Sequence, residues 1–130
     1  RNRHMELILV NCDTIFWINI LQIRNKDKKN FVDQKEIELE EHFQYMLKYS
    51  NYYKVCIADG VFAGFVGNVN GDLRIGVSDH FKRKGIGKFM LENFKLFSNV
   101  KQVKVKTDNE ASIKLFESFG FKKNLYLMSK

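Results

Sequence analysis

The chain alternates short runs of apolar and β-branched residues with longer stretches in which apolar residues recur every three or four positions. The first pattern is typical of strands and the second of amphipathic helices, so we expect a chain that mixes both. Strands are predicted at residues 6–10, 52–58, 61–69, 73–77, from 103 and at 125–128. Helices are predicted at residues 14–24, from about 39, from 86 and after 109.

Two of the predicted elements need comment. The segment 14–24 is apolar almost all round, so a buried strand is the alternative to a helix there. It is followed by an expected charged turn at 25–30 and an irregular connection at 31–38. The helix from residue 39 begins with glutamates and has Lys48 near its end, which suits the helix dipole. One apolar face is expected on it: Leu39, Phe43, Met46 and Leu47.

Two turns link three of the strands. Asp59-Gly60 and Asn70-Gly71 stand between apolar runs. Both dipeptides favour the primed turns of two-residue hairpins. The strands at 52–58, 61–69 and 73–77 are therefore predicted to form an antiparallel meander.

A basic glycine turn, Lys82-Arg83-Lys84-Gly85-Ile86-Gly87-Lys88, lies between the strand at 73–77 and the next helix. A helix start leaves backbone N–H groups without partners, and glycines let an anion approach them. The four cations of this turn add positive charge at the same point. The pattern predicts a pyrophosphate site, and a merely basic, solvated turn is the alternative.

Two familiar phosphate motifs do not fit this turn. A dinucleotide fingerprint needs a third glycine where Met90 stands, and a Walker A loop needs Ser or Thr where Phe89 follows Lys88. Neither of these motifs therefore accounts for the turn.

The stretch Lys82–Gly87 resembles the acyl-CoA loop of the GNAT superfamily of N-acetyltransferases, which reads Gln/Arg-x-x-Gly-x-Gly/Ala. Lys82 departs from that pattern because it keeps a cation but loses the planar fork of arginine. A second block, residues 103–121, is similar to the superfamily's next strand, asparagine, helix and closing Gly-Phe. The resemblance covers residues 52 to 121.

The resemblance implies an α/β (α+β) fold of GNAT type: a central mixed, largely antiparallel sheet that splays at the acyl-CoA site, flanked by about four helices. It also implies acetyl-CoA as the cosubstrate. The residues implied to bind it are Ile75, Gly76, Val77, Lys82, Arg83, Lys84, Gly85, Ile86, Gly87, Lys88, Asn109, Ser112 and Phe116. For Gly76, a bulge without any ligand is the alternative.

The chemistry that the resemblance implies is direct transfer of an acetyl group to a primary amine. The family often protonates the leaving thiolate with a tyrosine seven residues after the asparagine, and Phe116 stands at that position. Phenylalanine cannot donate a proton. Either another group or water serves, or the protein is a weak catalyst, and core packing under the cofactor is the simpler role for Phe116.

A third group, Arg24 and Asn25 with Glu41 and His42, is similar to the Arg-Asn … Glu-Glu-His arrangement of GNAT enzymes that acetylate nucleotide-linked amino sugars. It implies that His42 is the catalytic base, its charge supported by the neighbouring carboxylates. An ordinary surface histidine is the alternative. Arg24, Asn25 and Glu41 become candidate substrate-binding residues, and Arg24 either pairs an acceptor phosphate or forms a salt bridge with Glu41.

Composition narrows the class of protein. The chain has 130 residues, no proline and no linker-like tract, so one domain is expected. Residues 1–4 look like a cloning remnant, which leaves one acyl-CoA N-acyltransferase domain at 5–130. The net charge is +7, or +5 without Arg1 and Arg3, and suits a polyanionic cofactor. Since the cations near the loop fit one cofactor, we do not expect nucleic acid to bind.

Cys12 and Cys56 form no disulfide framework or metal cluster by spacing, and no apolar run reaches the length of a membrane span. We expect a reduced, soluble, cytoplasmic protein without metal.

The acceptor side should be open because the tail after Phe121 is short. An open side suits a bulky acceptor or a neighbouring subunit in a homodimer. Rival functions are CoA binding with little or no activity, and acetylation of a protein amine.

Overall fold

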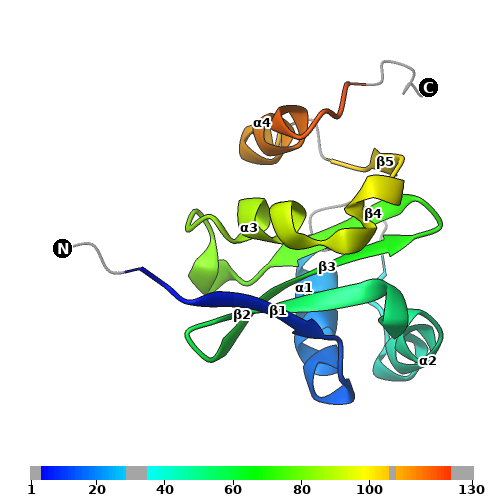
Figure 1. Cartoon of the computed structure of the whole chain (residues 1–130). Coiled ribbons are helices and arrows are strands. Elements are labelled where there is room, and N and C mark those ends of the chain that lie inside the picture. Colours follow the sequence, from blue (N-terminus) through cyan, green and yellow to red (C-terminus); the bar gives the residue numbers. More distant parts are fainter. Residues whose placement is uncertain (1–3, 29–34, 106–107, 124–130) are drawn as a thin grey trace.

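The computed structural model describes residues 4–28, 35–105 and 108–123. Its centre is one five-stranded sheet in the order β1-β2-β3-β4-β5 (Figure 1). The first four strands are antiparallel to their neighbours and the fifth is parallel to β4. The predicted mixed, largely antiparallel sheet is therefore confirmed. Its strands are β1 (Leu7–Asn11), β2 (Tyr53–Ala58), β3 (Val61–Val69), β4 (Asp72–Val77) and β5 (Gln102–Val103).

Both hairpin turns have the backbone that their sequences predict. Asp59 and Gly60 have φ values of 49° and 83°, and Asn70 and Gly71 have 56° and 88°. Two successive residues with positive φ form the primed turn, whose twist matches that of the flanking strands. The meander β2-β3-β4 is thus fixed locally by two short turns.

In the described part of the chain, four α-helices cover the two faces of the sheet, with α1 and α2 on one face and α3 and α4 on the other (Figure 1). The helix α1 continues to Lys28, so the predicted turn is wrong over residues 25–28. The helix α3, predicted from residue 86, begins at Ile86 and ends at Asn93. The predicted strand at 125–128 lies outside the described residues. The helices are α1 (Trp17–Lys28), α2 (Leu39–Tyr49), α3 (Ile86–Asn93) and α4 (Glu110–Ser118).

Each face of the sheet has its own apolar core. Ile20 of α1 and Met46 of α2 pack with Val55 and Phe65 of the sheet. On the opposite face a second core is formed by side chains of the sheet, α3 and α4, among them Val66, Ile86, Met90, Leu91 and Phe116. The sheet therefore separates the α3 region from the α1–α2 layer.

The buried face of α2 differs from the prediction. Of the four apolar residues expected to share one face, only Met46 is buried, and His42 is buried beside it. Leu39, Phe43 and Leu47 are exposed instead. The face of α2 that meets the core carries Met46 and His42, and the His42 ring hydrogen-bonds to the Trp17 carbonyl of α1.

Candidate active site

The sheet is open along part of β4. β5 pairs with β4 only at Asp72 and Leu73, whereas β3 pairs with β4 along its full length. Among the described residues, positions 74–77 of β4 have no strand on the side of β5. The expected splay between these two strands is thus present (Figure 1).

Backbone groups of β4 point into this opening. The N–H of Ser78 donates to the carbonyl of Ala63 on the β3 side, at 2.9 Å. Alternate residues of an antiparallel ladder bond to the same neighbour, so every second residue back from Ser78 also bonds to β3. Ile75 and Val77 therefore direct their N–H and C=O groups to the open side, where an extended ligand can pair with them.

The turn before α3 presents further backbone donors. Arg83 and Gly85 have positive φ values, 64° and 81°, and Gly85 caps the helix. The first backbone bond of α3 runs from the Phe89 N–H to the Gly85 carbonyl, at 3.0 Å. The N–H groups of residues 86–88 therefore precede the helical ladder. No atom of the described residues lies within 4 Å of where a Gly85 Cβ would be, so this helix start is accessible from their side.

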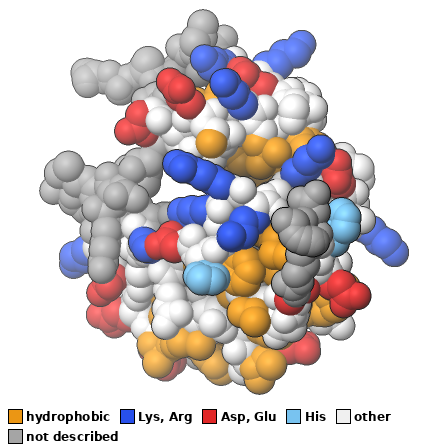
Figure 2. All heavy atoms as spheres, turned by 90° about the vertical axis from the view of Figure 1, so that its left-hand side faces the viewer, with side chains coloured by type: hydrophobic (Ala, Val, Ile, Leu, Met, Phe, Trp, Pro, Cys, Tyr) orange, Lys and Arg blue, Asp and Glu red, His pale blue; other side chains and the backbone are white. Residues whose placement is uncertain are grey.

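Positive charge surrounds the same turn. The side chains of Lys82, Arg83, Lys84 and Lys88 are exposed. Figure 2 shows Lys and Arg side chains gathered on this face of the molecule. Lys82 pairs with Asp79 at 3.3 Å, and Asp79 also pairs with Lys26 of α1. The charge and the free backbone donors together fit a pyrophosphate.

Two of the glycines near the opening are needed for packing. A Cβ on Gly76 would lie 2.7 Å from both the Ile23 Cγ2 and the Phe65 Cε2 atoms. The β3–β4 register runs through Gly76 without a shift, so the bulge considered for it is wrong. A Cβ on Gly87 would lie 3.0 Å from the Leu115 Cδ2 atom, which shows how closely α4 approaches α3.

The start of α4 is capped by Asn109, whose Oδ1 accepts a hydrogen bond from the Ser112 N–H at 3.1 Å. Phe116 is buried, and its ring meets Phe121 edge-on with the centroids 5.7 Å apart. The core-packing interpretation of Phe116 is thus confirmed. Contact of these residues with the cofactor stays a prediction.

His42 is buried between the two helices of its layer, with 1 % of its surface exposed. Its Nε2 donates to the Trp17 carbonyl at 2.7 Å, and its Nδ1 lies 3.0 Å from Arg24 Nη1. Arginine can only donate, so Nδ1 accepts and the ring is neutral. Burial lowers the pKa of His42, and the Arg24 charge lowers it further, whereas glutamates were expected to raise it. This geometry weighs against His42 as the base.

Arg24 has an unusual set of partners. Besides His42, its guanidinium lies over the Tyr45 ring, 4.6 Å from the centroid. No ion pair joins it to Glu41 or to another described carboxylate, so the salt-bridge alternative is not observed. Glu41 is exposed in the first turn of α2. Within the described residues, His42 is the one hydrogen-bond partner of the Arg24 guanidinium.

Asn25 holds the connection that leads into α2. Its Nδ2 donates to the Ile37 carbonyl at 3.0 Å, and its Oδ1 accepts from the Ile37 N–H at 2.7 Å. Both polar ends of its amide are therefore engaged with the backbone. The observed role of Asn25 is structural, and substrate contact stays a prediction.

A polar group beside Arg24 was not predicted. The hydroxyls of Tyr45 and Tyr53 are 2.6 Å apart, and Arg74 of β4 interacts electrostatically with both rings. Burial is the main cause that raises the pKa of Tyr53, so this phenol stays protonated. An arginine inside an otherwise apolar strand was the one local signal of this cluster.

A pocket of about 190 Å³ lies on the α1 side, where β4 ends. Its apolar floor is formed by Ile23, Phe62 and Val77, and polar side chains of Gln22 and Ser78 line it. Lys82 also lines this pocket, so the pocket adjoins the basic turn before α3.

The family described as acetyltransferase (GNAT) domain matches residues 49–123, more than half of the chain. The chain therefore belongs to the GNAT acetyltransferase family, and its enzyme class is that of acetyl-CoA-dependent N-acetyltransferases. The comparison with curated proteins gave no match. Among the described residues there is no group of side chains suited to a metal and no helix that could span a membrane.

Solved structures share the fold at low identity. Aminoglycoside N-acetyltransferase AAC(6')-Iy with CoA is 14% identical over 98% of this chain and 95% of its own, with a TM-score of 0.70. An acetyltransferase from Salmonella typhimurium with acetyl-CoA is 17% identical over 89% and 79%, with a TM-score of 0.73. Diaminobutyrate acetyltransferase from Paenibacillus lautus is 20% identical over 89% and 75%, with a TM-score of 0.64.

Proposed function

We propose that this chain transfers the acetyl group of acetyl-CoA to a primary amine of a small molecule. The observation that carries the proposal is the continuity between the open edge of β4 and the glycine turn at the start of α3. An acyl-CoA has an extended amide-bearing arm and a pyrophosphate. The first suits a strand edge and the second suits a helix start.

The proposed cofactor contacts follow from this arrangement. Backbone groups of Ile75 and Val77 hold the arm, while those of Gly76 face β3, and the N–H groups of residues 86–88 hold the pyrophosphate with help from Lys82, Arg83, Lys84 and Lys88. The contact between Gly87 and Leu115 brings α4 beside the same helix start. This supports a place for Asn109, Ser112 and Phe116 along the cofactor.

The reaction needs a free amine. Acetyl-CoA supplies a thioester whose C–S bond breaks as the amine nitrogen bonds to the carbonyl carbon, and the amine proton finally resides on the thiol. An alkylamine has a pKa of about 10.4, so its deprotonation at pH 7 costs roughly 4.6 kcal/mol. Because both His42 nitrogens are engaged, we assign the proton that frees the amine lone pair to solvent, and the second nitrogen proton passes to the leaving thiolate as the C–S bond breaks.

For the acceptor we propose a nucleotide-linked amino sugar. Arg24 has spare donors and no carboxylate partner among the described residues, which suits a phosphate. Arg74 interacts with the same tyrosines, but its guanidinium is paired with Asp72 at 2.9 Å, so the proposal rests on Arg24. Solved proteins of this fold include enzymes named for aminoglycoside and diaminobutyrate acetylation, which are small-molecule amines.

The test is acetyl-CoA turnover, followed as free thiol, with nucleotide-linked amino sugars, free amino sugars, diamines and a peptide amine. We expect turnover to be fastest with the nucleotide-linked sugars. Arg24→Lys should raise the KM for those acceptors more than for free amino sugars, because lysine lacks the fork. Acetyl-CoA binding without turnover on any amine would favour the CoA-binding alternative, and turnover on the peptide alone would favour a protein acceptor.

A further inference from the structure

An exposed apolar stripe runs along α2. Leu39, Phe43 and Leu47 follow one another every four residues, so they lie in a row on the helix surface. Their side chains are 58, 39 and 60 % exposed. An amphipathic helix normally buries such a row, so this one lacks a cover within the described part of the chain.

The stripe continues onto the neighbouring helix. The ring of Trp17 meets that of Phe43 with centroids 4.9 Å apart, and Ile15 and Ile18 beside it are 74 and 48 % exposed. Figure 2 shows apolar side chains gathered along its lower edge, where α1 and α2 lie in Figure 1. Single exposed apolar residues are ordinary, but a contiguous group marks an interaction surface.

Acetyl-CoA does not explain this surface. The basic turn opens α3, which packs on the other face of the sheet (Figure 1). The five apolar side chains all belong to α1, α2 and the turn before α1. Their partner must therefore be something other than the cofactor.

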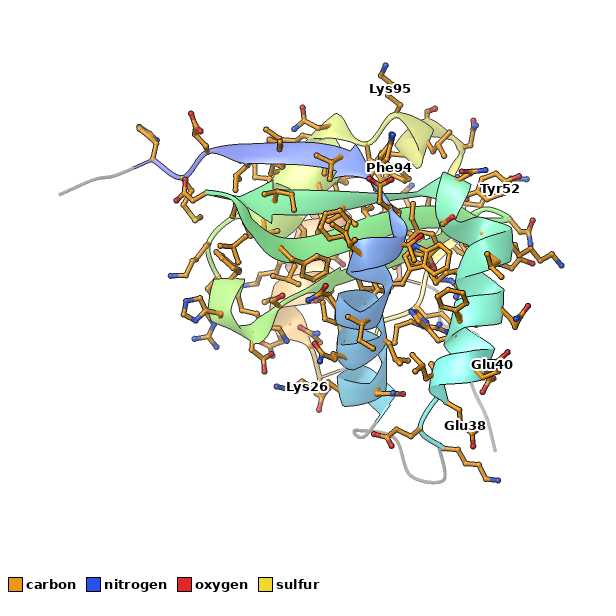
Figure 3. The ribbon with its side chains drawn as sticks, turned by 90° about the horizontal axis from the view of Figure 1, so that it is seen from below. Lys26, Glu38, Glu40, Tyr52, Phe94 and Lys95 are labelled. Atoms are coloured by element: carbon orange, nitrogen blue, oxygen red, sulfur yellow. The ribbon has the colours of Figure 1, made fainter. Side chains whose placement is uncertain are left out.

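The charges of α2 are polarised along its length. Glu38, Glu40 and Glu41 stand at its start and Lys48 in its last turn. Figure 3 shows Glu38 and Glu40 at the end of α2 that is far from Tyr52, with the Glu40 side chain pointing away from α1. One end of the stripe is thus acidic and the other basic.

We propose that a second copy of this chain docks on the surface, with the two α2 helices antiparallel about a two-fold axis at Phe43. This symmetry sets Leu39 against the partner's Leu47, so the apolar row covers itself. It also places Glu40 and the partner's Lys48 on the same side of the contact and at similar positions along the two helix axes. The two helix dipoles then run in opposite directions, and each acidic start meets a basic end.

The same charges disfavour a parallel pair of α2 helices and a membrane as partners of this surface. A parallel pair would bring the two acidic starts together. A membrane surface with anionic lipids attracts apolar faces bordered by Lys and Arg, whereas glutamates border this one. The proposal does not depend on the proposed function, because no cofactor-binding residue takes part in it.

The first test is the mass in solution, measured by sedimentation across a range of concentrations. We expect a monomer–dimer equilibrium for the full chain. Leu47→Glu should raise the dimer Kd about tenfold or more by placing a charge in the apolar row. Val61→Glu is the matched control, since Val61 is 55 % exposed but lies at the β2–β3 hairpin, and its Kd should equal that of the parent.

A charge swap tests the antiparallel arrangement. Glu40→Lys and Lys48→Glu should each weaken the dimer, and the double variant should recover affinity because opposite charges face each other again. A monomer at every concentration, a Leu47→Glu variant that dimerises like the parent, or a double variant weaker than both singles would overturn the proposal. Binding of the monomer to anionic vesicles would overturn it in favour of a membrane.

Discussion

A histidine with both ring nitrogens bonded inside the protein is held in one protonation state. His42 spans the two helices of its layer, from the Trp17 carbonyl to the Arg24 guanidinium. Protonating Nδ1 would remove the acceptor for Arg24 and leave two cations side by side. The neutral ring therefore stabilises the contact between α1 and α2.

The free energy of unfolding should consequently depend on pH through His42. Its pKa is lowered in the folded state from 6.5, chiefly by burial. The unfolded chain therefore binds the proton more readily, and this stability is present above pH 6.5 and is lost as the pH falls toward the folded pKa. Urea unfolding of His42→Gln should show a flatter dependence over this window. His80→Gln, at an exposed position, should keep the parent's dependence.

The burial of His42 also predicts how its replacement affects kcat. We expect folded His42→Gln to keep kcat at saturating acetyl-CoA within about threefold of the parent, and to keep the shape of its pH profile. Loss of a general base costs about 10²-fold or more. A fall of that size, with loss of the acidic limb of the profile, would show that the ring acts on the acceptor amine after all.

Phe116 allows a further test at the level of one side chain. Phe116→Tyr adds a hydroxyl to a ring that is buried against Phe121. An unpaired buried hydroxyl costs about 1–3 kcal/mol, so we expect a lower free energy of unfolding and no gain in turnover. The measurements are urea unfolding and thiol release. Faster turnover would instead mean that the hydroxyl reaches the leaving sulfur.

At the scale of elements, the position of α1 on the sheet depends on a glycine, Gly76, which has no side chain to occupy the space between them. Gly76 leaves room for Ile23 of α1 and for the Phe65 ring of β3. Because Gly76 also belongs to the open part of β4, the packing of α1 and the geometry of the opening share one residue. A change there should alter both.

Gly76→Ala is therefore expected to destabilise the fold by about 1–3 kcal/mol through overpacking. The measurement is chemical unfolding of the single variant and of Gly76→Ala combined with Ile23→Ala. Removing the Ile23 branches relieves part of the clash, so the two changes should not be additive. Full additivity would mean that α1 does not press on Gly76.

The elements that sequence patterns predict well are those with local signals. Asp59-Gly60 and Asn70-Gly71 fix their turns, and Gly85 begins α3 where its positive φ is needed. The orientation of α2 was mispredicted because the pattern offered a wide apolar face. The buried face includes His42, whose hydrogen bond to Trp17 joins residues 25 positions apart and has no local signal in the sequence.

The candidate site also has one part with a local sequence signal and one part without it. The turn at 82–88 is contiguous in the chain, so its motif shows it before any fold is known. The group formed by Arg24, Tyr45, Tyr53 and Arg74 comes from four elements and has no sequence spacing of its own. Only the packing of α1 and α2 on the sheet brings it together.

For the whole molecule, the sheet divides two surfaces of different character. The chain carries a formal net charge of +7, and its basic turn opens α3 on one face. The α1–α2 layer on the other face presents the apolar stripe. Salt should therefore weaken binding of the polyanionic cofactor, while contacts among the apolar side chains should depend little on salt.

Acetyl-CoA should stabilise the whole fold by mass action. A ligand that binds only the folded chain adds about 2.7 kcal/mol to the free energy of unfolding at 100 times its Kd. Thermal unfolding with increasing acetyl-CoA measures this gain, and added salt should reduce it because exposed cations contribute to binding. Gly87→Val should abolish the gain if, as proposed, the pyrophosphate approaches the backbone at this residue.

The control addresses the second role of Gly87. Its Cβ would press on Leu115 at 3.0 Å, so the single variant is expected to lose some stability even without ligand. Gly87→Val with Leu115→Ala gives the new side chain room, and this double variant should fold with the same circular dichroism as the parent yet show no shift with acetyl-CoA. If the folded double variant were still stabilised by the cofactor as strongly as the parent, the pyrophosphate would have to bind elsewhere on the basic face.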